Sequence, residues 1–73
     1  MDSEHIIKQF GKSLKELRLK KDWSQTKLGV EAGIEPQHVG KLERGLHEPG
    51  IVTVIMLARA LGCRPGELLD ELM

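Results

Sequence analysis

The side chains of this sequence that are best suited to binding chemistry lie close together, between residues 37 and 44. Gln37, Lys41 and Arg44 follow one another at intervals of four and three residues, so on a helix they share one face. The amide of Gln37 can donate and accept hydrogen bonds, whereas Lys41 and Arg44 carry positive charge and only donate. Gly40 adds no bulk between them. Such a face suits a partner that is anionic and offers planar hydrogen-bonding edges, as DNA does in its major groove.

Enzymatic chemistry has less support in the residues. No nucleophile stands at a recognisable spacing from a base, no glycine-rich loop of the phosphate-binding kind is present, and 73 residues leave little room for a ligand-sized cleft. The spacing of His5, His38 and His47 is not that of a metal site. We therefore expect no enzyme activity, no cofactor, no metal ion and no small-molecule ligand.

Charge is distributed unevenly along a chain whose formal net charge is zero. Residues 8–44 carry nine basic and five acidic side chains, whereas acidic residues are in excess at both ends. This asymmetry can give a neutral protein one positive face, although ordinary solvated lysines explain Lys12, Lys15 and Lys20 equally well. No segment is apolar enough to span a bilayer, and the single cysteine, Cys63, favours a reducing compartment. We expect a cytoplasmic protein without a membrane partner.

Hydrophobic periodicity and capping signals predict an all-α fold with five helices and no strand. Ser24 is a good N-cap and Gly33 a good C-terminal stop, Pro36 suits a first helical position, and Gly45 and Gly62 end two further helices. The expected helices span residues 3–20, 25–32, 36–44, 51–61 and 67–72.

The second and third expected helices are joined by only three residues, Gly33, Ile34 and Glu35. So short a connection forces the two helices to cross steeply, and a glycine at the end of the first allows the left-handed backbone that the turn requires. This is the arrangement of a helix-turn-helix, over about residues 24–45, whose second helix has the width of the DNA major groove.

At these positions the sequence resembles the Cro/C1-type helix-turn-helix family of phage repressors and xenobiotic-response-element-like regulators, over roughly residues 10–69. The matching pieces are Leu17-Arg18, Ser24-Gln25-Thr26-Lys27-Leu28, Ala32-Gly33-Ile34, Val39 with Leu42-Glu43-Arg44-Gly45, Pro49, and Leu57-Ala58-Arg59-Ala60-Leu61-Gly62. The resemblance implies a single five-helix, lambda repressor-like (phage-repressor-like) DNA-binding domain over residues 1–73. It also implies a transcriptional regulator that binds a (pseudo)palindromic double-stranded DNA operator as a homodimer, with a recognition helix over about residues 36–44 in the major groove.

The same resemblance implies roles for individual residues. Arg18 and Glu43 match an internal ion pair that ties the first helix to the end of the third. Pro36 stands at a base-reading position but has no donor, so it offers only apolar contact, for instance to a thymine methyl group. The residues expected to contact bases are Gln37, Lys41 and Pro36, and those expected to contact phosphates are Gln25, Arg44 and His38.

The fourth expected helix is more apolar than one buried face requires. Val54, Leu57, Ala58 and Leu61 form a stripe wide enough to face the core, yet a second face is apolar too, and the chain has no further element to cover it. A twofold contact between two copies would bury this face and set two recognition helices about 34 Å apart, one turn of DNA. The residues expected at that dimer interface are Ile51, Val52, Ile55, Met56, Leu69 and Leu72.

Zero net charge keeps a second class of function open, namely an antitoxin-like or other protein-binding helix-turn-helix module. Among DNA-binding regulators, the residues are compatible with a phage repressor of the Cro kind, an antitoxin, or a controller protein of a restriction–modification system. They favour neither repression nor activation. The small size and the long first helix are most similar to the controller group.

Overall fold

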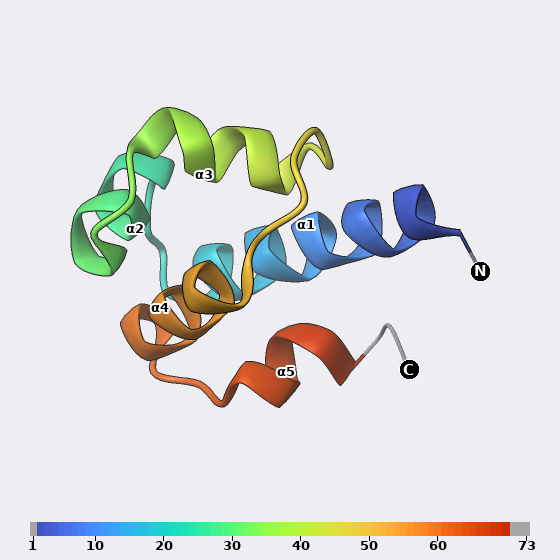
Figure 1. Ribbon diagram of the computed structural model, residues 1–73. Coiled ribbons are helices and arrows are strands. Elements are labelled where there is room, and N and C mark those ends of the chain that lie inside the picture. Colours follow the sequence, from blue (N-terminus) through green and yellow to red (C-terminus); the bar gives the residue numbers. More distant parts are fainter. Residues whose placement is uncertain (1, 71–73) are drawn as a thin grey trace.

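All regular elements of the protein are helices, in a computed structural model that describes residues 2–70 (Figure 1). The helices are α1 (Ser3–Lys20), α2 (Gln25–Ala32), α3 (Pro36–Glu43), α4 (Ile51–Leu61) and α5 (Pro65–Leu69). The prediction of an all-α fold with five helices is confirmed over these residues. None of the helices described is long and apolar enough to cross a membrane.

The predicted helix bounds hold for the first four helices to within one residue, but not for the last. The final helix was expected over residues 67–72, and α5 instead begins at Pro65 and ends at Leu69. Proline is favoured at a first helical position because its φ is already helical. The side chain of Glu67 also accepts a hydrogen bond from the backbone N–H of Arg64 at 3.3 Å, which stabilises the earlier start. Leu72 lies outside the described residues.

Local capping determines where α1 and α2 begin and where α2 ends. The side chain of Asp2 accepts a hydrogen bond from the backbone N–H of His5 at 2.8 Å, and Ser24 accepts one from Lys27 at 3.0 Å. Gly33 closes α2 with φ 73°, in the left-handed region that glycine adopts without strain. These caps confirm the predicted limits of α2 and leave residues 33–35 as the whole connection to α3.

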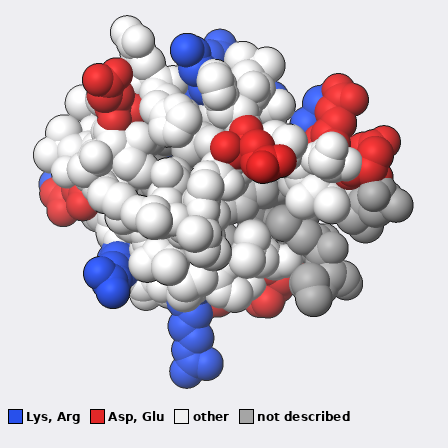
Figure 2. Space-filling view, viewed as in Figure 1, with Lys and Arg blue, Asp and Glu red and all other residues white. Residues whose placement is uncertain are grey.

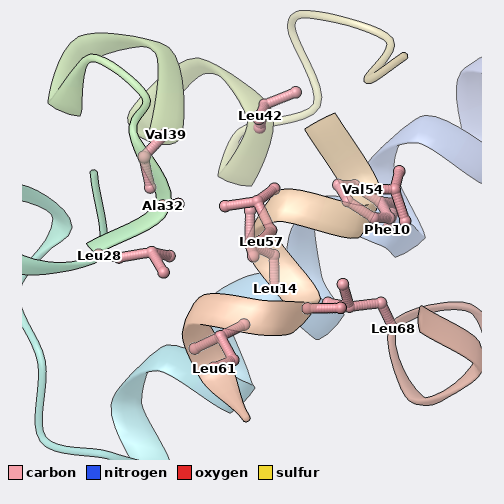
Figure 3. Packing of buried hydrophobic residues seen from close by; sticks show 11 residues of the cluster. Phe10, Leu14, Leu28, Ala32, Val39, Leu42, Val54, Leu57, Leu61 and Leu68 are labelled. Atoms are coloured by element: carbon pink, nitrogen blue, oxygen red, sulfur yellow. The ribbon is translucent and has the colours of Figure 1, made fainter. Parts of the chain in front are cut away.

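One apolar core joins all five helices, and Figure 3 shows their side chains meeting in the interior. The predicted core stripe of α4 is confirmed, because all four of its residues are buried. On α1, Phe10 and Leu14 are buried, whereas Ile6 is 38% exposed, since the first turns of α1 reach the edge of the bundle (Figure 1). The buried apolar residues are Phe10, Leu14, Leu28, Ala32, Val39, Leu42, Val54, Leu57, Ala58, Leu61 and Leu68.

The backbones of helices α1 and α3 are in close contact at Gly11. A β-carbon at this position would stand 2.3 Å from the carbonyl oxygen of Leu42 and 2.7 Å from that of Glu43. Only glycine allows two helix backbones to come so near. This contact brings the C-terminal end of α3 against the middle of α1, about two helical turns before Arg18.

We expect Gly11→Ala to lower the free energy of unfolding by about 1–3 kcal/mol, because the added methyl group must push α1 away from α3. This loss exceeds the gain in helix propensity that alanine brings over glycine. Urea denaturation followed by the fluorescence of Trp23 measures the change.

Gly66→Ala is the matched control for this measurement. A β-carbon at Gly66 would meet only Oδ1 of Asp70, at 4.0 Å, so this variant should unfold within about 0.5 kcal/mol of the wild type. Equal losses in the two variants would contradict a close contact at Gly11.

Candidate nucleic-acid interface

The outer face of α3 is the part of the helix-turn-helix that is open to a partner. Val39 and Leu42 are buried and hold α3 on the core, whereas Gln37, Lys41 and Arg44 are exposed on the opposite side. In Figure 1, α3 lies along one edge of the molecule with no other helix outside it. The sequence spacing therefore predicted correctly which side chains of this helix point outward.

Tertiary packing adds a residue of α2 to this face. Gln25, the first residue of α2, lines the same shallow hollow as Gln37, Gly40, Lys41 and Arg44. The hollow thus combines two amides and two cations from two different helices. Four of the six residues expected to contact DNA are brought together here.

The two other expected contact residues lie beside this hollow rather than in its lining. Pro36 is partly buried at the start of α3. His38 is also partly buried, and its ring stands edge-on to the ring of His47, with 5.7 Å between the ring centroids. Within residues 2–70, no group of three or more potential ligands is placed to hold a metal ion.

A buried ion pair lies directly beneath this face. Arg18 Nε donates to Glu43 Oε2 at 2.6 Å and Arg18 Nη2 donates to Glu43 Oε1 at 3.0 Å, which gives a bidentate pair between α1 and α3. Arg18 Nη1 also donates to the carbonyl oxygen of Trp23 at 2.7 Å. The hydrogen bond to Glu43 raises the pKa of Arg18 above its ordinary value, although burial acts in the opposite direction. Arg18 therefore stays charged, and α1, α3 and the start of α2 share one set of hydrogen bonds.

Glu43 has a further partner, Gln25, that sequence spacing did not indicate. Gln25 Nε2 donates to Glu43 Oε1 at 3.0 Å. The two residues are 18 positions apart and come from different helices, so no local periodicity relates them. This hydrogen bond connects the exposed hollow to the buried ion pair.

Two lysines stand beside the N-terminal end of α2. The Nζ atoms of Lys21 and Lys27 lie 5.0 and 5.7 Å from the centre of the Trp23 ring, within the range of cation–π attraction. Trp23 itself is partly buried and packs against the core. The positive charge of these two lysines therefore lies beside Trp23, next to the first turn of α2.

A second exposed surface, of apolar character, lies on α4. Ile51 and Val52 are 71% and 65% exposed, and Ile55 and Met56 are each 36% exposed. Figure 2 shows the face of the molecule seen in Figure 1. Most charged side chains stand near the edge of this view, and its middle is almost free of them. Leu69 of α5 is partly buried against the core and lines an apolar hollow together with Ile51.

The sequence matches the Helix-turn-helix family over residues 14–68. It is 32% identical over 62 residues to Control protein C.BamHI of Bacillus amyloliquefaciens, a match that covers 84% of this chain and 76% of that protein. It is also 34% identical over 68 residues to the uncharacterized HTH-type transcriptional regulator y4dJ of Sinorhizobium fredii, covering 93% of this chain and 84% of that protein.

Solved structures give the same fold. The crystal structure of the restriction-modification controller protein C.AhdI from Aeromonas hydrophila is similar to this structure with a TM-score of 0.84. The two sequences are 39% identical, over 85% of this chain and 94% of that chain.

We expect Arg18→Met to lower the free energy of unfolding by about 3–5 kcal/mol, because it leaves the buried carboxylate of Glu43 without its charged partner. The double variant Arg18→Met, Glu43→Leu should lose less, since no unpaired charge remains inside the protein. Urea denaturation of the wild type, both single variants and the double variant gives the coupling energy.

Lys27→Met is the control, because it removes a partner from an exposed ion pair. Lys27 Nζ lies 2.9 Å from Glu31 Oε1, and the two side chains are 50% and 42% exposed. Its unfolding free energy should change by less than about 1 kcal/mol. Additive losses for Arg18 and Glu43 would show that their pair contributes no coupling.

Proposed function

The chain belongs to the helix-turn-helix family of Cro/C1-type transcriptional regulators, and on that basis we propose that it is a sequence-specific regulator that binds double-stranded operator DNA as a homodimer. The observation that carries this proposal is the exposed outer face of α3, where Gln37, Lys41 and Arg44 are joined by Gln25 in one hollow. An α-helix fits the width of the major groove, and amide and ammonium groups are the donors and acceptors that base edges and phosphates require.

Within this proposal the side chains of the hollow divide into two groups. Gln37 and Lys41 project from the middle of α3 and read base edges, for which glutamine suits adenine and lysine suits guanine. Arg44 lies at the end of α3 and Gln25 at the start of α2, and both bind phosphates at the sides of the groove. Orientation on the duplex then comes from the phosphate contacts, and sequence preference from the base contacts.

The residues beside the hollow take lesser roles. Pro36 offers an apolar surface to a thymine methyl group at the start of α3. His38, paired edge-on with His47, lies near the DNA backbone and binds phosphate there.

The exposed apolar face of α4 supports dimerisation. Val52 and Ile55 belong to a helix that already buries its opposite side in the core, and no helix among residues 2–70 covers them. A twofold-symmetric contact would bury Ile51, Val52, Ile55 and Met56 of both copies. Leu69 contributes at the edge, because part of its side chain is used by the core. Two recognition helices related in this way address two half-sites of a (pseudo)palindromic operator.

Similarity to controller proteins indicates the regulatory setting. The chain covers most of the length of both C.BamHI and C.AhdI, and over the aligned residues it is 32% and 39% identical to them. We therefore place it, within the regulator class, as a controller of a restriction–modification system.

We expect Gln37→Ala and Lys41→Ala each to reduce operator affinity by about 1–3 kcal/mol and to relax base preference at one position per half-site. The reason is that each change removes a hydrogen bond to a base edge and leaves the phosphate contacts intact. A duplex selected by the wild type from a random-sequence library, together with its single-base variants, is titrated against each protein. If both variants still distinguish the selected duplex from its single-base variants as well as the wild type does, α3 does not contact the bases.

Arg44→Ala is the control on the same helix. Removal of one phosphate contact should weaken binding about equally for all sequences and reduce the slope of log affinity against log salt by about one. An unchanged slope would contradict a phosphate contact at Arg44.

We expect Val52→Asp to yield a monomer at micromolar concentration, where the wild type sediments as a dimer, because a carboxylate in the interface must be desolvated without a partner. Operator affinity should fall by at least about 100-fold, since the second half-site is then no longer linked to the first. Val52 is 65% exposed, so the monomer itself tolerates the charge.

Leu19→Asp is the matched control, because Leu19 is 55% exposed on α1 and is not among the residues proposed for the interface. It should sediment and bind operator as the wild type does. A wild-type monomer bound at a single half-site would contradict the proposed dimer.

A further inference from the structure

The amide of Gln25 is held in place within the hollow before any partner binds. Its Nε2 donates to Glu43 Oε1 at 3.0 Å, and its amide lies across the backbone of α3 at Gly40. A β-carbon built at Gly40 would stand 3.2 Å from Gln25 Oε1 and 3.6 Å from Nε2. The first of these distances is shorter than ordinary van der Waals contact, so a side chain at position 40 would require the amide to move by a few tenths of an ångström.

The orientation of this amide is determined by its partner. An ionised carboxylate only accepts hydrogen bonds, so Nε2 must face Glu43 and Oε1 must face away from it. Glu43 cannot turn to follow a moving glutamine, because both of its oxygens already accept hydrogen bonds from Arg18 and its side chain is only 2% exposed. The anchor of Gln25 is therefore part of the rigid interior.

Gly40 is otherwise difficult to explain. Glycine in the interior of a helix is less favourable than alanine, and position 40 has an ordinary helical backbone that does not require it. The close approach of the Gln25 amide supplies a physical reason for the absence of a side chain here.

We propose that Glu43 and Gly40 are positioning residues for DNA binding, which hold the Gln25 amide in one orientation beside the reading face of α3. The inference rests on the proposed function. It adds that the buried ion pair is connected, through Glu43, to the Gln25 amide proposed to contact DNA. One Nε2 hydrogen of Gln25 stays available to a phosphate. Because the side chain is already ordered, binding does not have to immobilise it, which saves about twofold to tenfold in affinity.

The variant Gly40→Ala tests this positioning without touching the ion pair. Its methyl group should displace the amide of Gln25, so that affinity for the library-selected duplex falls by about twofold to tenfold. Stability in urea should stay close to that of the wild type, because the gain in helix propensity offsets the weakened hydrogen bond between Gln25 and Glu43. In a Gln25→Ala background, Gly40→Ala should have no further effect on affinity.

Two results would overturn the proposal in this experiment. A loss of affinity that is equally large in the Gln25→Ala background would mean that the added methyl group meets DNA directly. Unchanged affinity of Gly40→Ala in the wild-type background would mean that the orientation of Gln25 does not matter. Gly66→Ala, the same substitution in α5, serves as control and should leave affinity unchanged.

A measurement on the free protein separates this inference from the proposed function. NMR order parameters of the side-chain NH₂ groups should be high for Gln25 and low for Gln37, which is exposed on the same face and serves as internal control. In Gly40→Ala the value for Gln25 should fall toward that of Gln37. Equal values in the wild type would overturn the positioning, whereas a wild type that retains the difference but binds no duplex would overturn the proposed function and the DNA-binding role of Gln25 with it.

Discussion

The bidentate ion pair between Arg18 and Glu43 is the interaction on which the geometry of the binding face depends. Both groups are removed from water, so the pair is favourable only when its hydrogen bonds are well made. A shift of α3 relative to α1 would break those bonds and leave charges unpaired in the interior. Since Arg18 also donates to the carbonyl group of Trp23 just before α2, the same guanidinium fixes α3 and the start of α2 relative to α1.

Glu43 takes part both in the buried ion pair that stabilises the fold and in the hydrogen bond that holds Gln25 in the hollow. Glu43 accepts hydrogen bonds from Arg18 on its inner side and from Gln25 on the side of the hollow. The exposed amide is thus connected to α1 through a carboxylate that solvent hardly reaches. For the proposed contact with DNA such an anchor is an advantage, because preorganised side chains lose little freedom on binding. The close contact at Gly11 serves the same end, since it sets the spacing between α1 and α3.

The two exposed surfaces have different physical origins. The hollow on α3 is polar and follows from the outward side of an amphipathic helix whose other side holds Val39 and Leu42 in the core. The face on α4 is apolar and follows from a helix that is hydrophobic almost all round, of which the core covers one side only. In Figure 1, α3 lies at the top of the molecule and α4 at the lower left, so the two surfaces are on different helices and different sides of this view.

The sequence by itself determined the helices and the outward face of α3, because these depend on neighbours within a few residues. Ser24 and Gly33 bound α2 through contacts with their own turns, and the spacing of Gln37, Lys41 and Arg44 places them on one side of a helix. The predicted start of the last helix was wrong, because proline is favoured at a first helical position and α5 begins at Pro65, two residues before the start that periodicity suggested. Periodicity and spacing could not supply the pairing of Glu43 with Arg18 and Gln25, and only the resemblance to a family indicated Arg18. Only the tertiary structure decided that Gln25 joins the hollow and lies on Gly40, because those contacts join helices whose approach is set by packing, and no rule of local spacing relates residues 18 or 25 positions apart.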